Sequence, residues 1–268
     1  MNLVARMLSE GARPLAPKGV RVDTDRRVAL LNATSTYVGP PLSRLLAARG
    51  HDLVLGDPAP GLVEELEALG ATVEVVDGAT DLAAPDAAER LVAAGIARFG
   101  RIDAAIAYSG AIVTGPFVDS TPEDLAKVVR GCMEAPYRFL RAVVPAMVDR
   151  GEGQVLVVTS ASAARPTPGA PLYSAARAGA TMLAKNVAAE VARTGVQVNA
   201  VGTNFMDFPE FLSASGVVDA ESRAKVESRV PMRRLGSLEE FASFCMPYVD
   251  GTSTFTTGQF VAYAGGWA

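Results

Sequence analysis

The stretch V-A-L-L-N-A-T-S-T-Y-V-G, residues 28–39, joins a short apolar run to a polar loop that ends in a glycine. The segment L-S-R-L-L-A-A-R, residues 42–49, follows it, and its apolar residues recur with helical spacing. A buried strand, a short loop and a helix in this order predict the first half of a strand–helix–strand unit. The fold of the chain depends on whether this unit is repeated.

Six further apolar runs occur along the chain after this first one. They cover residues 52–55, 72–76, 103–107, 154–158, 196–201 and 259–263, and stretches of helical period, such as 87–99 and 175–192, lie between most of them. Alternating strands and helices are typical of a parallel sheet, and runs made largely of Val, Leu, Ile and Ala indicate strands covered on both faces. We therefore expect an α/β fold with a single doubly wound, Rossmann-like parallel sheet that carries helices on both faces.

Length and composition limit the number of domains and the kinds of partner. The chain has 268 residues, of which 49% are hydrophobic, and a formal net charge of −4. That length suits one α/β domain, or two small ones, with a large core. The mild acidic balance argues against nucleic acid or an anionic membrane as the main partner. Residues 1–27 carry arginines and prolines without a clear period, so we expect a flexible N-terminal leader before a Rossmann-like catalytic domain at 28–268.

Residue counts narrow the location and the chemistry. No run of about 18 apolar residues is present, which predicts that no segment spans a membrane. The two cysteines, Cys132 and Cys245, are too few for a disulfide scaffold, and these features together favour a cytoplasmic protein. The single histidine, His51, excludes a histidine-rich metal cluster, so no metal is expected. Its place directly after Gly50 predicts an exposed turn residue.

The loop after the first strand departs from the pattern of a phosphate-binding loop. Dinucleotide-binding folds place glycines here, at the spacing G-x-x-x-G-x-G, so that the backbone can approach a pyrophosphate. This chain has Ala33, Tyr37 and Gly39 at those positions, and only the last glycine, which serves close packing of helix and strand, is kept. Tyr37 would fill the space of the phosphate, so we expect no nicotinamide cofactor.

Asp57 is evidence for the opposite interpretation. It stands at the end of the second strand, 18 residues after Gly39, near the position at which an acidic residue holds a ribose in such folds. The structural alternative is a solvated aspartate in an Asp57-Pro58 turn.

A serine, a tyrosine and an arginine follow in an order that suggests a catalytic group. The fifth strand ends in T-S-A-S, residues 159–162, and a helix opens with Y-S-A-A-R, residues 173–177. Tyr173 and Arg177 are four residues apart and therefore share a helix face, while Ser160 lies at the strand tip. The fold brings this strand tip and the start of the following helix to the same edge of the sheet.

This order resembles the short-chain dehydrogenase/reductase superfamily, in which a serine and a Tyr-x-x-x-Lys helix follow the fifth strand, over about residues 28–268. Arg177 in place of the lysine, and the broken glycine loop, resemble the halohydrin dehalogenases, which use the same scaffold without a nicotinamide cofactor. The aromatic Tyr37 agrees, as does G-T-N-F-M, residues 202–206, where that family builds a halide site. The segment A-Y-S-G, residues 107–110, departs from the N-N-A-G of the reductases.

The resemblance implies a set of site residues. Those implied as catalytic are Ser160, Tyr173 and Arg177, and those implied for halide binding are Thr203, Asn204, Phe205, Met206 and Tyr37. In the family pattern the backbone N–H groups of Phe205 and Met206 face the anion, while Asn204 holds the turn. An acidic residue that supports the arginine in that family has no counterpart near Ser109.

These residues would permit ring closure to an epoxide. A free tyrosine has a pKa near about 10, and a guanidinium about 4–5 Å away can lower it by roughly 2–3 units at an effective dielectric of about 20. Tyr173 would then take the proton of a hydroxyl group that Ser160 orients, and the alkoxide would attack the neighbouring carbon as halide leaves. In reverse, Tyr173 would protonate the oxygen of an epoxide that an anion opens.

The leading hypothesis is therefore a carbon–halogen lyase, a halohydrin dehalogenase that converts vicinal haloalcohols to epoxides. Its partners would be a haloalcohol or epoxide and small anions, with no nucleic acid and no membrane. The resemblance also implies a homo-oligomer, either a dimer or a tetramer, because relatives on this scaffold commonly pack the helices near 121–149 and 172–194 against a second copy. These stretches are rich in alanine and valine here, which permits close packing. Two alternatives stand beside it: an NAD(P)-dependent short-chain reductase that keeps Asp57 and the Ser/Tyr pair, and a non-catalytic binding protein on the same fold.

Overall fold

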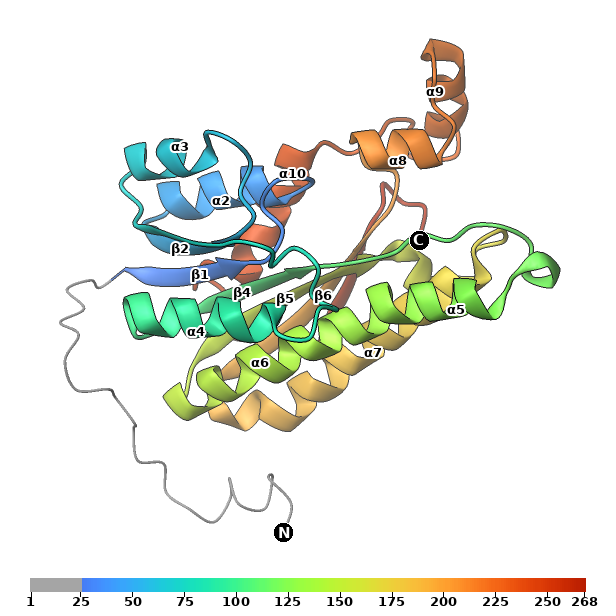
Figure 1. Ribbon diagram of the computed structural model, residues 1–268. Coiled ribbons are helices and arrows are strands. Elements are labelled where there is room, and N and C mark those ends of the chain that lie inside the picture. The colour runs from blue at the N-terminus through green and yellow to red at the C-terminus, as the bar shows by residue number, and fades with distance from the viewer. Residues whose placement is uncertain (1–25) are drawn as a thin grey trace, which may run out of the picture.

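The computed structural model describes residues 26–268, in which seven parallel strands form one sheet (Figure 1). The strands lie in the order β3-β2-β1-β4-β5-β6-β7. In chain order they are β1 (Arg27–Leu31), β2 (His51–Gly56), β3 (Val73–Val76), β4 (Ala104–Tyr108), β5 (Gly153–Ser160), β6 (Val196–Thr203) and β7 (Phe260–Tyr263). Every predicted run forms one of these strands, which confirms the expected α/β architecture.

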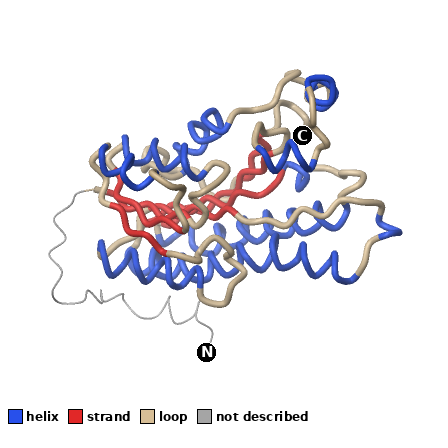
Figure 2. The backbone as a smooth tube through the Cα atoms, turned by 45° about the horizontal axis from the view of Figure 1, so that its top comes forward, coloured by secondary structure: helices blue, strands red, loops and turns tan. Residues whose placement is uncertain are grey.

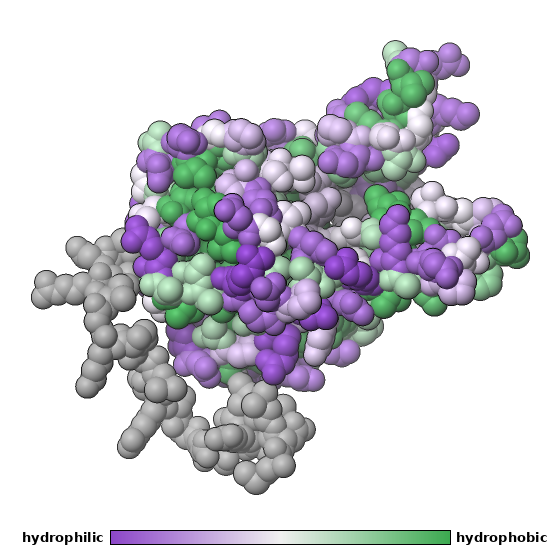
Figure 3. Space-filling model, in the orientation of Figure 1, coloured by the Kyte–Doolittle hydropathy of each residue, from purple (hydrophilic) through white to green (hydrophobic). Residues whose placement is uncertain are grey.

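Helices cover both faces of the sheet, as strands without a polar face require (Figure 2). On one face lie α2 (Gly39–Ala48), α3 (Leu62–Ala68) and α10 (Leu238–Cys245), and on the other lie α4 (Ala87–Phe99), α6 (Ala135–Arg150) and α7 (Pro171–Val191). An arm made of α8 (Pro209–Ala214) and α9 (Ala220–Glu227) projects from the body beyond one end of the sheet (Figures 1 and 3). The body is thus a three-layer sandwich, and its two apolar cores lie between the sheet and each helical layer.

The order of the strands reverses between β1 and β4, because β1 pairs with β2 on one side and with β4 on the other. Ligands of such sheets bind beyond the carboxyl ends of the strands at this point, here called the switch-point crevice. The side chain of Asn32 spans the crevice: Nδ2 donates to Tyr108 O at 2.9 Å, and Oδ1 accepts from Tyr108 N at 2.8 Å. Asn32 therefore holds the ends of β1 and β4 together.

One π-helical turn interrupts the long helical run before β5. The helix α5 (Pro122–Val129) leads into the turn Arg130–Glu134, from which α6 continues. Such turns are rare and occur frequently at functional sites. Within this turn Cys132 is fully buried, and its Sγ lies 3.5 Å from Ala111 N and 3.7 Å from Ala111 O. The π turn thus places a core thiol against the loop that follows β4.

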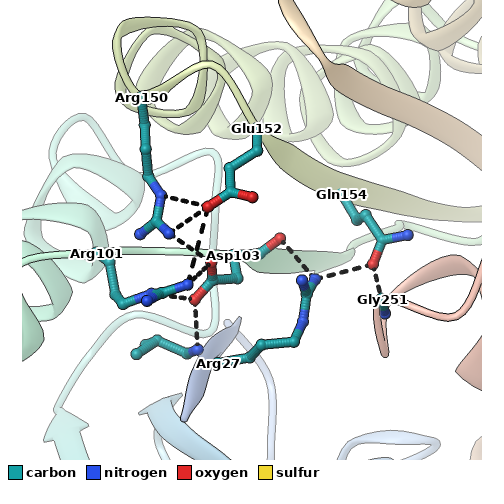
Figure 4. Close-up of polar contacts among 8 residues, drawn as sticks. Arg27, Arg101, Asp103, Arg150, Glu152, Gln154 and Gly251 are labelled. Carbon is teal, nitrogen blue, oxygen red and sulfur yellow. Dashed lines mark hydrogen bonds and ion pairs between the residues drawn. The ribbon is translucent and has the colours of Figure 1, made fainter. Parts of the chain in front are cut away.

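A charged cluster ties the opposite, amino-terminal edge of the sheet together (Figure 4). The carboxylate of Asp103, whose side chain is 1% exposed, accepts hydrogen bonds from Val28 N at 2.8 Å and from Arg101 Nε at 2.7 Å, and Arg150 lies 3.2 Å away. The side chain of Arg27 donates to the main-chain oxygen of Asp103. Burial works to raise the pKa of Asp103, but these hydrogen bonds and the charge of Arg150 outweigh burial and lower the pKa.

His51 is buried, so the prediction of an exposed turn residue is wrong. The residue is 2% exposed and begins β2, where it pairs with Arg27. The physical reason is the tightness of the preceding turn: Gly50 has φ 81°, a conformation that glycine adopts without a steric penalty. The strand therefore starts directly after the glycine, and the Nδ1 of His51 lies 3.2 Å from Leu46 O under helix α2.

Some expectations are not decided by the fold. The leader expected at 1–27 lies almost wholly outside the described residues, and its role stays a prediction. Across residues 26–268, no helix is both long enough and apolar enough to cross a membrane. The cytoplasmic location, the homo-oligomer and the exclusion of nucleic acid and membrane as partners stay predictions.

Candidate active site

Ser160 is the last residue of β5, and it is buried, at 5% exposure, at the carboxyl edge of the sheet. Its hydroxyl donates to Thr203 O at 3.3 Å, and its oxygen accepts from Ser162 Oγ at 2.9 Å and from Ser162 N at 3.2 Å. Gly202 allows β5 and β6 to approach this closely, because a Cβ at that position would overlap the backbone of Ser160. The strand pairing and the following turn thus fix the position of the serine oxygen.

Tyr173 and Arg177 lie one turn apart near the start of α7. The guanidinium carbon of Arg177 lies 5.1 Å from the centre of the Tyr173 ring, within the range of a cation–π contact. Nη1 of Arg177 lies 3.5 Å from Val158 O, on the strand that ends in Ser160. Tyr173 is half-buried, whereas Arg177 is 4% exposed. The structure therefore brings these two side chains together, as the four-residue spacing predicts.

Main-chain oxygen atoms, rather than a carboxylate, hold the buried Arg177. Its Nη2 donates to Ser109 O at 2.6 Å, at the end of β4. A Cβ on Gly110 would overlap this guanidinium, so the glycine after Ser109 provides the room for it. Burial works to lower the pKa of Arg177, but neighbouring groups, Tyr173 foremost, outweigh burial and raise the pKa. The guanidinium is therefore a permanent positive charge beside the phenol.

The loop after β6 is held by hydrogen bonds of its own. Asn204 Oδ1 accepts from Phe205 N at 2.9 Å, as expected of a residue that holds the turn. Phe205 has φ 56°, in the left-handed region, and its ring packs on Phe211 with centroids 5.7 Å apart. The N–H of Phe205 is thus already bonded within the loop. The halide role stays a prediction for the residues to which the dehalogenase resemblance assigned it: Thr203, Asn204, Phe205, Met206 and Tyr37.

Tyr37 packs into the switch-point crevice. Its ring stacks on that of Tyr108 with centroids 4.8 Å apart, and the ring of Phe208 lies 4.5 Å away on a tilt. Its hydroxyl donates to Thr203 Oγ1 at 2.8 Å, and the residue is 5% exposed. Burial raises the pKa of Tyr37 well above its usual value, although the hydrogen bond with Thr203 works against this. Tyr37 is therefore a neutral phenol that links the first loop to β6.

In the first loop, Tyr37 has a backbone conformation that favours glycine, the residue expected at this position. Tyr37 has φ 52°, a left-handed conformation that costs a residue other than glycine roughly 1–3 kcal/mol. At the third glycine position, a Cβ on Gly39 would overlap Ala33 O. Gly39 therefore serves close packing, but of the helix against the loop after β1 rather than against the strand itself.

Asp57 is bound to the loop that follows β3. Its Oδ1 accepts from Gly78 N at 2.6 Å, and its Oδ2 accepts from Ala79 N, Thr80 N and Thr80 Oγ1. Burial works to raise the pKa of Asp57, but these hydrogen bonds outweigh it and lower the pKa. Asp57 therefore organises residues 78–80, whose main-chain and side-chain donors bond to its carboxylate.

The residues of the crevice, arranged in this way, do not fit a bound nicotinamide dinucleotide. The Tyr37 ring fills the space in which a phosphate would approach the first loop, and its stack with Tyr108 closes the gap between the strand ends. The carboxylate of Asp57, the candidate ribose ligand, is bonded elsewhere. Within the described part of the chain, no group of three or more His, Cys, Asp or Glu residues could hold a metal ion.

Three contributors to the site were not identified from the sequence. They are Ser162, which donates to Ser160, Gly110, which makes room for Arg177, and Tyr108, which supplies half of the stack. Two of them lie in A-Y-S-G, residues 107–110, and the departure of this segment from N-N-A-G was the signal that could have marked them. Ser162 carried a weaker signal as the second serine of T-S-A-S.

Comparison with known proteins provides an independent assignment. Residues 36–268 match the family described as enoyl-(acyl carrier protein) reductase. A 3-oxoacyl-(acyl-carrier-protein) reductase of Thermotoga maritima is 27% identical over 245 residues, which cover 90% of this chain and 97% of the relative. An uncharacterized NAD-dependent oxidoreductase of Mycobacterium tuberculosis is 34% identical over 199 residues, which cover 68% of this chain and 72% of the relative.

Solved structures of similar proteins share the fold. A gluconate 5-dehydrogenase from Burkholderia cenocepacia, in complex with NADP and tartrate, has a TM-score of 0.81 at 25% identity, covering 92% of this chain and 97% of that one. Levodione reductase has a TM-score of 0.80 at 25% identity, covering 90% of this chain and 96% of that one.

The expectation of a cofactor-free carbon–halogen lyase is wrong, because these relatives are named as reductases, dehydrogenases and oxidoreductases. That expectation depended on local departures, chiefly Arg177 and Tyr37. The similarity to oxidoreductases instead extends over nine-tenths of the chain. The reductase alternative is therefore the better supported of the hypotheses.

Proposed function

Because the chain belongs to the short-chain dehydrogenase/reductase superfamily, through the family described as enoyl-(acyl carrier protein) reductase, we propose that it is an NAD(P)-dependent oxidoreductase that interconverts an alcohol and a carbonyl compound. The observation that carries the proposal is the contact of Tyr173 with a buried Arg177 that also reaches the strand ending in Ser160. The nicotinamide class of coenzyme is the one named for several of the relatives.

Tyr173 is the proton donor and acceptor in this proposal. In reduction its phenol gives a proton to the carbonyl oxygen while the carbonyl carbon gains a hydride, and in oxidation its phenolate takes the proton of the hydroxyl. Tyr173 is half-buried in the first turn of α7, and the proposal requires that a substrate reach its hydroxyl from the carboxyl edge of the sheet. The residues of the chain account for this proton transfer, and the hydride would come from the nicotinamide coenzyme.

Arg177 acts through Tyr173. A phenolate is unfavourable near pH 7 unless a positive charge lies beside it. The guanidinium lies 5.1 Å from the ring centre and is shielded from solvent, where a charge interaction is stronger than in water. Arg177 is therefore a positioning residue that holds a positive charge beside the catalytic phenol.

Ser160 orients the oxygen that reacts. The oxygen of Ser160 already accepts two hydrogen bonds from Ser162, so the hydroxyl takes part in any further hydrogen bond as the donor. That proton now goes to Thr203 O over 3.3 Å, a long and therefore weak hydrogen bond. Exchanging this bond for one to a carbonyl oxygen costs little, and the proposal places that oxygen between Ser160 and Tyr173.

The test is the carbonyl-dependent oxidation of NADH and NADPH, measured over a panel of ketones and aldehydes. The parent protein is expected to turn over part of the panel, and Tyr173→Phe should lower kcat by about 100-fold or more, since general acid–base catalysis contributes about 10²–10⁴-fold. Tyr137→Phe is the matched control, because Tyr137 is 54% exposed on α6, and it should keep the activity of the parent. A parent without turnover on the whole panel, or a Tyr173→Phe protein as active as the parent, contradicts the proposal.

A further inference from the structure

We infer that the ring of Tyr37 competes with a nicotinamide dinucleotide for the switch-point crevice, so that the coenzyme binds only after Tyr37 has left its stack. This inference rests on the proposed function and adds to it the residue that controls entry of the coenzyme. Four features of the described residues support it: the place of the ring, the fixed position of its neighbour, the conformation of its backbone and the contacts that hold it.

The overlap follows from where the ring lies. Tyr37 belongs to the loop between β1 and α2, and Tyr108 is the last residue of β4. A dinucleotide crosses a doubly wound sheet at the crevice between these two strands. Two rings with centroids 4.8 Å apart are in van der Waals contact, so nothing fits between them. The ring of Phe208 packs against Tyr37 as well, 4.5 Å away.

Asn32 fixes the main chain of Tyr108 by bonding both of its polar atoms. The same Nδ2 of Asn32 donates to Thr80 O at 2.9 Å, which joins a third segment to this point. Tyr37 instead follows Ser35 and Thr36, which are exposed. We therefore expect Tyr37, rather than Tyr108, to leave the stack.

The backbone of Tyr37 indicates that the side chain, rather than the loop, is the obstacle. Its φ of 52° is a conformation that glycine adopts readily and a bulky residue rarely adopts. A residue stays in such a conformation only where its surroundings hold it, and such residues cluster at functional sites. The loop thus has a backbone suited to the approach of a phosphate, with a phenol ring in the way.

The contacts that hold Tyr37 connect it to the catalytic edge of the sheet. Its hydroxyl donates to Thr203 Oγ1 at 2.8 Å, while Ser160 donates to the main-chain oxygen of the same residue. Phe208 directly precedes α8, the first helix of the projecting arm. Departure of Tyr37 therefore frees the Thr203 hydroxyl beside Ser160 and removes a packing partner from the base of the arm.

Competition of this kind lowers the apparent affinity for the coenzyme. When only a fraction of molecules is open, the measured Kd is the intrinsic Kd divided by that fraction. A residue that lacks the ring removes this factor without adding any contact to the coenzyme. Replacement of Tyr37 by glycine should therefore strengthen binding, which is the reverse of the usual effect of deleting a side chain in a binding cleft.

The test measures binding of NADH and of NADPH to the protein without substrate, by the fluorescence of the reduced nicotinamide. Tyr37→Gly should bind at least one of them about tenfold or more tightly than the parent. Tyr37→Phe is the matched control, because it keeps the ring and loses only the hydroxyl that bonds to Thr203, so any gain in its affinity should be well below that of Tyr37→Gly. Phe208→Ala relaxes the packing of Tyr37 from outside the loop and should give an intermediate gain. This variant decides the matter if circular dichroism shows that Tyr37→Gly does not fold.

The outcomes separate the inference from the proposed function. If the parent binds as tightly as Tyr37→Gly, or if Tyr37→Phe gains as much as Tyr37→Gly, the ring is not the obstacle and the inference is wrong. The same holds if no variant binds either coenzyme. Tight binding and turnover by the parent would overturn the inference alone and leave the proposed function standing. A gain in Tyr37→Gly without turnover that depends on Tyr173 would support the inference and contradict the proposed function.

Discussion

The guanidinium of Arg177 occupies the space that a side chain at residue 110 would need. Gly110 follows the residue whose main-chain oxygen accepts from Arg177 Nη2 at 2.6 Å, and a Cβ built on this glycine would overlap that nitrogen. The positive charge beside Tyr173 therefore depends on the absence of a side chain in a different segment of the chain.

Gly110→Ala should displace Arg177 and reduce turnover. A misplacement of about 1 Å in an active site can cost about 100-fold, and overpacking of this kind costs about 1–3 kcal/mol of stability. Steady-state kinetics and urea unfolding measure the two effects. In the double variant Gly110→Ala/Arg177→Ala the loss of stability should be smaller than the sum of the single losses, because the clash is gone. Additive losses would show that the guanidinium is not what the new methyl group meets.

Arg177→Ala and Arg177→Lys should differ in the rate of alcohol oxidation. Arg177→Ala removes the positive charge beside Tyr173 and should lower kcat, whereas Arg177→Lys keeps a positive charge and should retain more of the kcat of the parent. Steady-state kinetics of the two variants measures the difference. Equal losses of kcat would show that packing rather than charge is responsible, and that outcome would contradict the role given to Arg177.

Asp103→Asn should destabilise the protein most at neutral pH. The pKa of Asp103 is lower in the folded chain than in the unfolded chain, where it is about 3.9. The ionised carboxylate therefore stabilises the fold fully above the pKa of the unfolded chain, and this contribution is lost as the pH falls through the pKa of the folded chain. Breaking a buried, hydrogen-bonded charge cluster should cost roughly 2–4 kcal/mol at pH 7. Urea unfolding at pH 7 and near pH 3 measures the difference, which should shrink at the lower pH.

Glu152→Gln is the matched control for Asp103. It changes the same cluster (Figure 4), but the side chain of Glu152 is 56% exposed. Exposed ion pairs contribute little, so this variant should lose less than about 1 kcal/mol at pH 7. Equal losses in the two variants would show that burial does not govern the energetics of the cluster.

His51 should make the protein less stable as the pH falls below about 6.5. Burial, together with the charge of Arg27, lowers the pKa of His51 in the folded chain. The hydrogen bond with the Leu46 carbonyl and the charges of Asp250 and Asp103 work to raise the pKa, but they do not outweigh burial. The unfolded chain therefore binds more protons in this range, and stability rises with pH by at most about 1.4 kcal/mol per unit.

The single histidine makes this prediction simple to check. Urea unfolding of the parent and of His51→Gln between pH 5 and 7.5 should show a steeper loss toward acid for the parent, since glutamine does not titrate. Parallel curves for the two proteins would mean that another group is responsible for the loss.

The fold could be predicted from local pattern because burial on two faces leaves a plain signature. The run 87–99 forms α4 with the same bounds, and the run at 154–158 extends by only a few residues into β5. His51 was missed because its exposure depends on packing rather than on sequence neighbours. A polar residue after a glycine is usually a turn residue. Here the turn ends at Gly50, so His51 already belongs to β2 and lies buried beside α2.

The site could be predicted only in part. Tyr173 and Arg177 were found because helix periodicity fixes which residues share a face, whereas the partners of Arg177 are main-chain oxygens, which every residue type possesses. The dehalogenase hypothesis gave most weight to the unusual residues of one loop and one helix. The order of Ser160 and Tyr173 indicated the superfamily correctly, and the similarity to named reductases over nine-tenths of the chain outweighs departures confined to one loop and one helix.

The π turn at Arg130–Glu134 has a consequence for how sequences of this kind should be aligned. A π turn accommodates one inserted residue, and each residue of an α-helix advances the direction of its side chains by about 100°. A homologue without the insertion would therefore restore an unbroken helix, but it would rotate every later side chain of α6 relative to α5. An alignment that ignores the inserted residue would therefore place Cys132 on the wrong face of the helix. Deletion of a single residue in the turn would move the thiol to another face while leaving the hydrophobic content of the helix almost unchanged.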